Sequence, residues 1–264
     1  MGDFVNIEDS GRDKVAILRV DRAPVNAING QLSAELLAAA KELTTRSDIR
    51  AVVMWGGPKL FAAGADIKEF PSDGPAEERD PTPMTDPLNQ ALLTIEGLDQ
   101  ITISAVNGVA LGGGCEMSMA TDFRVCGESA RFGQPEILLG ITPGAGGTQR
   151  LTRLVGVTKS KEIGYSGRMV KADEALAIGL VSAVHPDADV LERSLDLAEQ
   201  YASAAAAISN VKRAIMDGLN AEDMADAIQI ERREFKKSFQ TDDAVIGIKS
   251  FIEHGPGKAE FTGK

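Results

Sequence analysis

The chain has 264 residues, of which 43% are hydrophobic and 25% are charged. This composition is typical of a globular protein with a sizeable core, and it excludes general disorder. The 28 basic and 39 acidic side chains give a net charge of −11, which is the wrong sign for a nucleic-acid or anionic-membrane surface. We therefore expect neither partner. If the substrate is an anion, its binding to a chain of this net charge needs a separate explanation.

The start of the chain and its cysteines point to the cytoplasm. The first residues show neither a basic n-region nor an apolar h-region, so no secretory signal is expected. No apolar run approaches the roughly 18 residues that a membrane span needs. Cys115 and Cys126 are too few for a disulfide framework, and no histidines cluster around them. We expect both to be small buried hydrophobes, and we expect no metal site.

The first half of the chain alternates expected strands with expected helices. Leucines and alanines at helical spacing predict a helix over 31–46. Alternation of this kind predicts an α/β core. Apolar runs predict the following strands: 15–20, 51–55, 101–106, 122–126 and 129–132.

The last part of the chain is expected to be helical. Strand patterns nearly vanish after Thr158, and apolar side chains keep one helical face after Met224. Thr241 stands where an N-cap would begin a final helix. We therefore divide the chain into an α/β core with the catalytic site, residues 1–200, and a C-terminal helical oligomerisation region, residues 201–264.

Prolines crowd into one acidic segment. Five of the 11 prolines fall within residues 71–87, where apolar periodicity is missing. We expect a long mobile loop there, which is either a variable surface insertion or a lid beside a pocket.

Glycines crowd into another segment, since ten of the 27 lie between Gly108 and Gly147. Such density indicates backbone that approaches a ligand, tight turns, or both. The glycine motifs of dinucleotide-binding proteins, P-loops and nucleophile elbows are each incomplete in this chain. Those three classes of site are therefore disfavoured.

With those motifs disfavoured, the function that remains for these glycines is hydrogen-bond donation by their backbone N–H groups. Within segment 105–120 a strand is expected to end, and a helix to begin, inside the triplet 112–114. Free N–H groups at a helix start can donate to a developing oxyanion, each with about 2.7–4 kcal/mol. The small-residue turn at 61–66 offers a second donor. Such turns also occur where elements merely pack closely, so both interpretations stay open.

Two isolated acids accompany the glycines. Glu116 is the only charged residue between Ile101 and Thr121, and Glu136 is the only one between residues 132 and 149. Each is either a partly exposed helix residue or a desolvated acid–base group. Desolvation and mutual repulsion would raise at least one pKa toward neutrality, which suits general acid–base catalysis.

Three segments together carry a family resemblance. Residues 61–69 (FAAGADIKE), 105–116 (AVNGVALGGGCE) and 132–151 (FGQPEILLGITPGAGGTQRL) resemble the enoyl-CoA hydratase (crotonase) family, and most of all its true hydratases. The resemblance covers nearly the whole chain. It implies a core of repeated ββα turns and a C-terminal helical region that trimerises. It also implies a homo-oligomer, either a trimer or a hexamer made of two trimers.

The resemblance also implies roles for individual residues in the reaction. The N–H groups of Ala65 and Gly113 would form the oxyanion hole for the thioester carbonyl. Glu116 would activate water, and Glu136 would exchange a proton with the α-carbon. Gly144 would match the backbone donor near the catalytic water.

Other positions would contact the coenzyme A part of the substrate. Ala63, Asp66 and Ile67 fall where the family contacts the adenine end. The tail departs from the family's basic pair, and Lys258 is the substitute for a phosphate contact there.

The activity implied by the resemblance is that of a hydro-lyase. It would add water reversibly, with syn geometry, to a trans-2-enoyl-CoA and give a 3-hydroxyacyl-CoA, in fatty-acid β-oxidation or related acyl-CoA catabolism. No cofactor is implied beyond the coenzyme A of the substrate. One alternative is double-bond isomerisation or other enolate chemistry on a CoA thioester, which needs only one base. The other is a non-catalytic acyl-CoA-binding oligomer.

Overall fold

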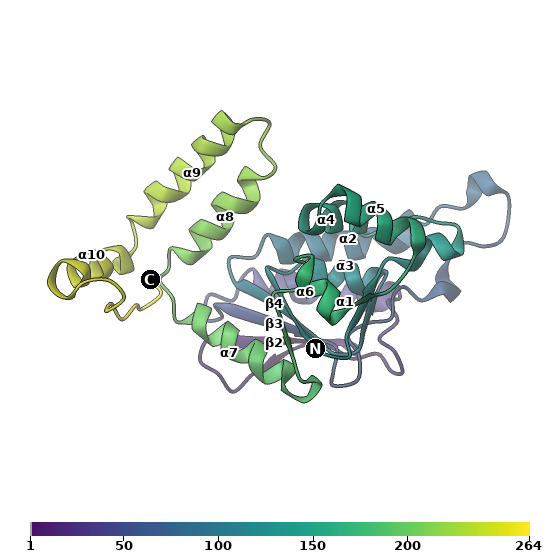
Figure 1. Ribbon diagram of the computed structural model, residues 1–264, viewed down its shortest axis with the longest axis horizontal. Helices are drawn as coiled ribbons and strands as arrows, with labels where there is room; N and C mark the ends of the chain where they lie inside the picture. Colours follow the sequence, from purple (N-terminus) through teal and green to yellow (C-terminus); the bar gives the residue numbers. More distant parts are fainter. Residues whose placement is uncertain (1) are drawn as a thin grey trace.

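The computed structural model describes residues 2–264 and contains two β-sheets covered by helices (Figure 1). The larger sheet has six strands in the order β1-β2-β3-β4-β6-β9, and only the β1–β2 pair is antiparallel. Its strands are β1 (Val5–Asp9), β2 (Val15–Val20), β3 (Ala51–Trp55), β4 (Ile101–Val106), β6 (Phe123–Gly127) and β9 (Ala183–His185). The smaller sheet consists of β5 (Val109–Leu111), β7 (Arg131–Gly133) and β8 (Val170–Lys171).

Helices surround these sheets and make up the C-terminal part. The α-helices are α1 (Gly30–Leu43), α2 (Thr82–Glu96), α3 (Gly113–Met119), α4 (Gly147–Val155), α5 (Val157–Ser166), α6 (Ala172–Ala177), α7 (Val190–Ala202), α8 (Ile208–Gly218), α9 (Met224–Ser238) and α10 (Asp242–His254). Short 3-10 turns are η1 (Ile67–Glu69), η2 (Ala76–Glu78), η3 (Pro135–Leu139) and η4 (Asp187–Asp189). No helix within residues 2–264 is both long enough and apolar enough to cross a bilayer.

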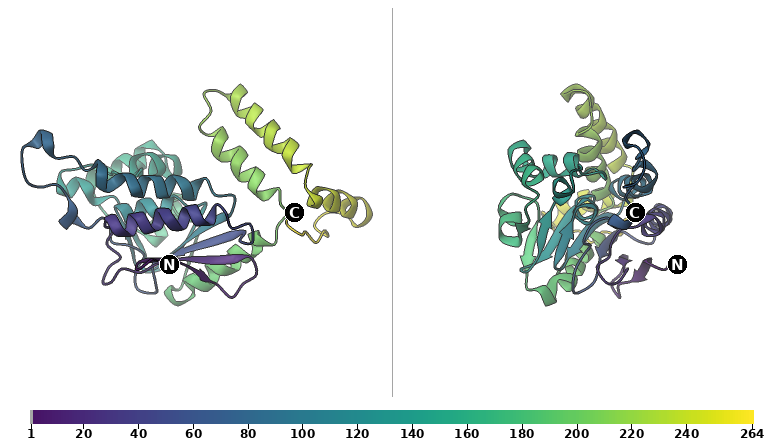
Figure 2. Two further views of the ribbon diagram at one scale, coloured as in Figure 1. Left: turned by 180° about the vertical axis from the view of Figure 1, so that it is seen from behind. Right: turned by 90° about the vertical axis from the view of Figure 1, so that its right-hand side faces the viewer.

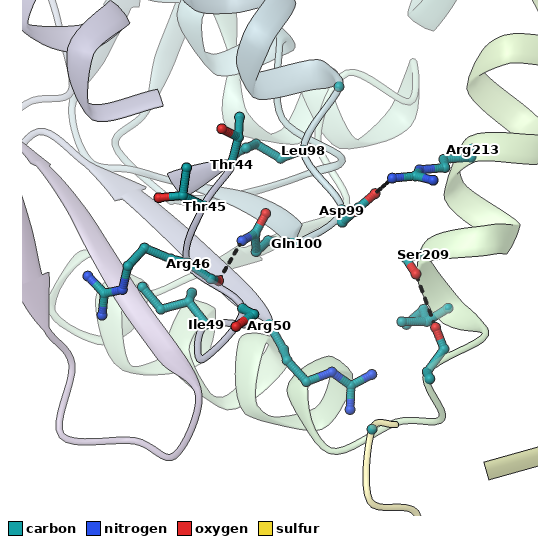
Figure 3. Close-up of a pocket in the computed structure, with 15 residues that line it drawn as sticks. Thr44, Thr45, Arg46, Ile49, Arg50, Leu98, Asp99, Gln100, Ser209 and Arg213 are labelled. Atoms are coloured by element: carbon teal, nitrogen blue, oxygen red, sulfur yellow. Dashed lines mark hydrogen bonds and ion pairs between the residues drawn. The ribbon is translucent and has the colours of Figure 1, made fainter. Parts of the chain in front are cut away.

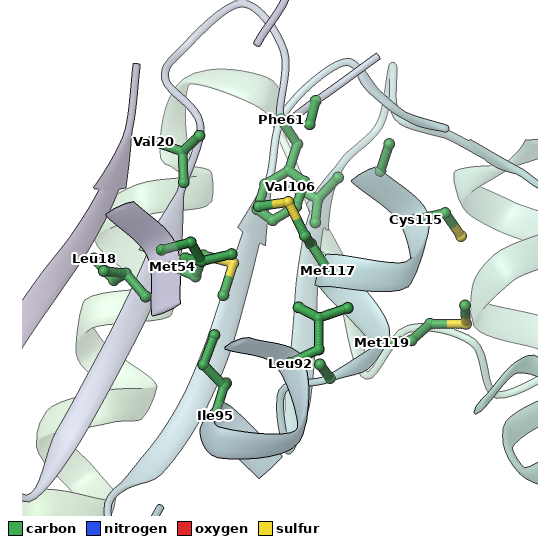
Figure 4. Packing of buried hydrophobic residues seen from close by; sticks show 14 of the residues in the cluster. Leu18, Val20, Met54, Phe61, Leu92, Ile95, Val106, Cys115, Met117 and Met119 are labelled. Carbon is green, nitrogen blue, oxygen red and sulfur yellow. The ribbon is translucent and has the colours of Figure 1, made fainter. Parts of the chain in front are cut away.

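The larger sheet is buried on both faces, which explains its continuous apolar runs. Alternate residues of β2 point to opposite sides. Leu18 and Val20 belong to the core shared with α1 and α2, whereas Val15 and Ile17 belong to the core that α7 covers. Figure 4 shows the first core, in which Met54 of the sheet lies near Ile95 of α2.

The C-terminal helices extend away from this core. Figures 1 and 2 show α8 and α9 as a hairpin that stands apart from the sheets, with α10 beyond it. Thr241 caps α10 as predicted, because its Oγ1 accepts a hydrogen bond from the N–H of Ala244 at 3.1 Å. Whether this region oligomerises stays a prediction.

The structure agrees with most of the expected elements. The predicted strands 15–20, 51–55 and 101–106 are β2, β3 and β4, and the predicted helix 31–46 is α1, which ends at Leu43. Cys115 and Cys126 are buried and free.

One expectation was wrong in part, because the loop predicted over 71–87 ends at Pro81. Residues 82–87 already belong to α2, whose first turn tolerates Pro83 because the first N–H groups of a helix have no intrahelical acceptor. Pro87 lies further inside the same helix. Proline content alone therefore overestimated the length of the loop.

Candidate active site

The glycine triplet forms the junction between β5 and α3, as predicted. β5 ends at Leu111 and α3 begins at Gly113, with Gly112 between them at φ +49°. A Cβ on Gly114 would lie only 2.3 Å from the carbonyl oxygen of Ala62. The absence of side chains here therefore lets α3 begin directly against the segment that carries residues 62–65.

Two backbone N–H groups next to this junction have no acceptor among residues 2–264. The two neighbours of Ala65 form a bridge with Ile28. The N–H of Ile28 donates to the carbonyl oxygen of Gly64, and the N–H of Asp66 donates to the carbonyl oxygen of Ile28, each at 2.8 Å. Neighbouring peptide groups alternate in direction along such a bridge, so the Ala65 N–H points away from Ile28. Neither this N–H nor that of Gly113 donates a hydrogen bond to any residue of 2–264.

The same two groups lie close together in space. A Cβ built on Gly113 would lie 3.8 Å from the Ala65 nitrogen. Unpaired donors from a helix start and from an adjacent segment form the arrangement that stabilises an oxyanion. The geometry therefore suits the role that the sequence suggested for this pair.

Glu116 is a buried carboxylate held by backbone donors. Its side chain projects from α3 and is 2% exposed. Its Oε1 accepts hydrogen bonds from the N–H of Ala145 at 2.8 Å and from the N–H of Gly147 at 2.7 Å. Oε2 accepts none from the described residues. Burial raises the pKa of Glu116, and the two N–H donors and the charge of Arg150 oppose that rise.

Glu136 lies close to the same glycine junction. It lies in η3, and a Cβ on Gly112 would be 3.0 Å from its Oε1. Its Oε2 is buried without a hydrogen-bond partner among the described residues. Burial raises the pKa of Glu136 to about 7, and repulsion from Glu116 adds to the rise. Glu136 is thus an acid that titrates near neutrality, as catalytic acid–base groups do.

Gly144 lies in the turn that leads into α4. Its carbonyl oxygen accepts a hydrogen bond from Nδ2 of Asn89 at 2.9 Å. Its N–H has no acceptor within residues 2–264. The structure thus leaves this N–H available to a bound molecule.

The residues expected at the adenine end form a connected segment. Ala63 donates its N–H to the carbonyl of Val25 at 3.1 Å, and Asp66 pairs with Arg22 at 2.9 Å. Hydrogen bonding from Arg22 lowers the pKa of Asp66, and the charge of Lys68 contributes. Ile67 is 62% exposed beside them.

Lys258 is not brought to this site within one chain. It follows α10, and Figure 1 places that segment at the end of the molecule away from α3. Any contact from Lys258 to a substrate bound here would have to come from another subunit.

Sequence reasoning missed three groups at the site. Ala145 and Gly147 hold Glu116 through their N–H groups, although only Gly144 had been singled out nearby. Asn26 orders the turn before Ala65, because its Nδ2 donates to the carbonyls of Gly56 at 2.8 Å and Phe61 at 2.9 Å. The available signal was an uncharged polar residue that stands between two apolar ones, Val25 and Ala27.

A separate cleft lies between the core and the C-terminal helices. It has a volume of about 460 Å³ and is lined by residues including Arg50, Gln100 and Arg213 (Figure 3). Its lining contains neither Glu116 nor Glu136. Arg213 pairs with Asp99, and Arg50 donates to the carbonyls of Ala204 and Ala205. The cleft is therefore not part of the candidate active site.

Comparisons with known proteins agree over nearly the whole chain. A family model described as Enoyl-CoA hydratase/isomerase matches residues 10–264. A short-chain-enoyl-CoA hydratase of Clostridium acetobutylicum is 39% identical over 243 residues, which cover 91% of this chain and 92% of that protein. A probable enoyl-CoA hydratase of Rhizobium meliloti is 40% identical over 260 residues, or 97% and 96% of the two chains.

Solved structures agree as well. An enoyl-CoA hydratase structure from Bacillus anthracis gives a TM-score of 0.88 at 33% identity, covering 98% of this chain and 99% of that one. A structure from Geobacillus kaustophilus gives a TM-score of 0.91 at 31% identity, covering 100% and 98%. These likenesses confirm the fold class predicted from the sequence.

Proposed function

Because the chain belongs to the enoyl-CoA hydratase/isomerase family, we propose that it is an enoyl-CoA hydratase, a hydro-lyase that adds water reversibly to a trans-2-enoyl-CoA. The observation that carries the proposal is the placement of two carboxyl groups, Glu116 and Glu136, around one glycine junction that also presents two unpaired N–H groups. Curated relatives with 39% and 40% identity bear the name of this activity.

The reaction begins with polarisation of the thioester. Its carbonyl oxygen accepts hydrogen bonds from the N–H groups of Ala65 and Gly113, which stabilise the negative charge that develops as the enolate forms. Because both donors are fixed backbone groups, they need no reorganisation during the reaction. Their contribution is about 2.7–4 kcal/mol each in a preorganised site.

Water is then added across the double bond. Glu116 takes one proton from the water as the water oxygen bonds to C3. Oε1 is held by backbone donors, which leaves Oε2, with no donor among the described residues, available for this step. Glu136 gives its proton to C2, so the π electrons form the new C–H bond. The N–H of Gly144 is available to orient the water. One proton is gained by Glu116 and one lost by Glu136, and solvent restores both carboxyl groups.

The pKa of Glu136 suits its role as the acid that protonates C2. With a pKa of about 7, a large fraction of Glu136 carries the proton at neutral pH. Burial raises the pKa of Glu116 as well, and the two N–H donors and Arg150 limit that rise. In the proposed mechanism hydration starts from one proton on the pair, carried by Glu136.

Coenzyme A binding is proposed beside η1. The backbone of Ala63 and the exposed turn at Asp66 and Ile67 would contact the adenine end. Arg22 and Lys68 are the cations whose charge reaches Asp66, and we propose them for the CoA phosphates. The net charge of −11 thus does not prevent binding of an anion, because the thioester meets uncharged N–H groups and local cations serve the phosphates.

A homo-oligomer, a trimer or a hexamer of two trimers, is part of the proposal. α8, α9, α10 and the turn after α8 leave large apolar side chains exposed, among them Leu219 (66%), Met224 (74%), Phe235 (64%) and Ile252 (76%). Such a surface favours association with other copies. Sedimentation equilibrium tests this, and a monomer at micromolar concentration would contradict it.

The cellular setting of this proposal is the cytoplasm. The two cysteines are free and buried, which suits a reducing compartment. The reaction needs no cofactor, because acid–base groups of the chain move both protons. We propose fatty-acid β-oxidation or related acyl-CoA catabolism as the pathway.

Substitution Glu136→Gln tests the function. The amide cannot supply the C2 proton, so hydration of crotonyl-CoA, followed by loss of the conjugated absorbance, should fall by at least about 10³-fold. Near-wild-type turnover would contradict the assignment. Conversion of a 3-enoyl-CoA to the conjugated isomer without hydration by the wild-type protein would favour an isomerase instead.

A further inference from the structure

The turn that holds Glu116 is itself held by α2. Its two Glu116-binding N–H groups belong to Ala145 and Gly147, so they come from alternate peptide groups, 144–145 and 146–147, at the start of α4. The carbonyl ends of these two peptides are bonded as well. The Gly144 oxygen, which shares a peptide group with the Ala145 N–H, accepts from Asn89 at 2.9 Å. That peptide is therefore fixed at both ends.

Arg150 fixes the following part of the turn. Its Nη1 donates to the carbonyl of Ala145 at 2.7 Å, and its backbone N–H donates to the carbonyl of Gly146 at 2.9 Å. A Cβ on Gly146 would lie 2.2 Å from Nη1, so the guanidinium packs directly against the turn. The Gly146 oxygen shares a peptide group with the Gly147 N–H, so the first turn of α4 fixes the second donor through the main chain. The Arg150 side chain fixes the peptide between the two donors, through the Ala145 carbonyl.

Glu96 holds the side chain of Arg150 in place. Its two carboxylate oxygens accept from Nε at 2.6 Å and from Nη2 at 2.8 Å, which is a bidentate pair. The side chains of Arg150 and Glu96 are only 11% and 23% exposed. All three directions of the guanidinium are thus assigned, two to Glu96 and one to the turn.

Asn89 and Glu96 come from one face of one helix. They are seven residues apart in α2, so they lie two turns apart on the same side. α2 begins directly after the acidic, proline-rich loop that precedes it. The helix therefore connects an exposed surface segment to the turn that orients a buried carboxylate.

We propose that Asn89, Glu96 and Arg150 are positioning residues that align the Ala145 and Gly147 N–H groups, and through them Glu116, for the activation of water. This inference rests on the proposed hydratase function. None of the three residues touches the reacting atoms. Their effect is on the orientation of the Glu116 carboxylate, so they influence the step at C3 and leave the step at C2 to Glu136.

Two reactions of the same protein separate these steps. Hydration of crotonyl-CoA needs Glu116 and Glu136, whereas exchange of the α-protons of butyryl-CoA with solvent deuterium needs only Glu136 and the oxyanion hole. Glu96→Gln should lower kcat for hydration at least about tenfold with KM within twofold. α-Proton exchange should stay within twofold of wild type.

A double-mutant cycle locates the effect in the pair. Arg150→Lys replaces a planar fork by a single ammonium, which cannot serve Glu96 and the Ala145 carbonyl in the same geometry. The double variant Glu96→Gln/Arg150→Lys should lose no more hydration than the worse single variant, because both act through one arrangement. Glu199→Gln is the matched control, since it removes an acid from an Arg12 ion pair on α7, on the other face of the sheet, and it should leave both reactions unchanged.

Equal losses of hydration and α-proton exchange in Glu96→Gln would overturn the proposal, because they would indicate a general structural role. Unchanged hydration would overturn it as well. A crystal structure of Glu96→Gln decides the question apart from turnover: we expect the turn 144–147 to shift and at least one N–H bond to Glu116 to be lost. If both bonds persist, the positioning role is wrong. A wild-type protein that never hydrates enoyl-CoA would contradict only the proposed function.

Discussion

The N–H of Gly147 donates a hydrogen bond to Oε1 of Glu116 at 2.7 Å, at a position where any side chain would collide with the same oxygen. A Cβ there would lie 2.8 Å from that oxygen and 2.4 Å from Oε1 of Gln134. Both neighbours are side chains, which can move where a backbone could not. A methyl group would therefore displace the carboxylate before it disrupts the fold.

Gly147→Ala should consequently lose activity while the protein stays folded. We expect kcat for crotonyl-CoA hydration to fall at least about tenfold, because misplaced catalytic groups cost that much or more, and KM to change little. Steady-state kinetics and circular dichroism check this result. Gly164→Ala is the control, since its Cβ would meet nothing within 4 Å in α5. Full activity of Gly147→Ala would show that Glu116 does not depend on this contact.

The pKa of Glu136 gives opposite pH dependences for two reactions. α-Proton exchange of butyryl-CoA needs the carboxylate, so its rate should rise about tenfold per pH unit below the pKa of about 7 and level off above it. Hydration needs the shared proton, so kcat/KM should fall as pH rises above about 7. Dehydration should show the same alkaline limb, because hydration consumes no net proton. An exchange rate without a bend between about pH 6 and about pH 8 would contradict Glu136 as the base.

Glu136→Gln should also stabilise the protein in alkaline solution. Burial raises the pKa of this carboxyl from 4.5 to about 7, so the folded state holds its proton more tightly than the unfolded state. The resulting stability is fully present below pH 4.5 and is lost as pH rises through 7. The Tm of the variant should exceed that of the wild type at about pH 8, and the gap should narrow toward acid. Glu77→Gln, on the exposed η2 turn, controls for the change in net charge.

Asn26→Ala should destabilise the turn that leads to Ala65. Asn26 is 4% exposed, and its loss leaves the carbonyls of Gly56 and Phe61 without these donors. Its φ of +51° is also unfavourable for alanine. We expect a loss of about 3 kcal/mol in the free energy of unfolding, measured with urea. The exposed Asn220 offers a matched Ala substitution that should cost much less. Equal costs would contradict the role of Asn26.

The sequence predicted those parts of the molecule that repeat a simple pattern. The runs at 15–20, 51–55 and 101–106 are strands because both faces of the sheet are buried, so alternation is missing and continuous apolar character is the signal. The loop at 71–87 was overextended, because proline weakens a helix prediction even in a first turn that tolerates it. Local composition cannot show whether a proline lies in the first turn of a helix, where it is tolerated, or in a loop.

The site was predictable only where glycines and isolated acids lie close in the sequence. Gly113 and Glu116 share one helix turn, so their association could be expected. The contacts to Ala145 and Gly147 join segments 29 and 31 residues away and are made by main-chain atoms. Backbone donors leave no signature in residue type. The Glu96–Arg150 pair, 54 residues apart, likewise needs the fold to become visible.

In the proposed mechanism the thioester is bound by the N–H groups of Ala65 and Gly113, which donate to no residue of 2–264, so its recognition does not depend on side-chain identity. Substrate capture and bond making are therefore encoded separately along the chain. A single codon change at Glu116 or Glu136 would alter which proton is transferred, while the same two N–H groups would still bind the thioester carbonyl. Such a scaffold can acquire a new reaction in one evolutionary step without first losing its affinity for the old class of substrate.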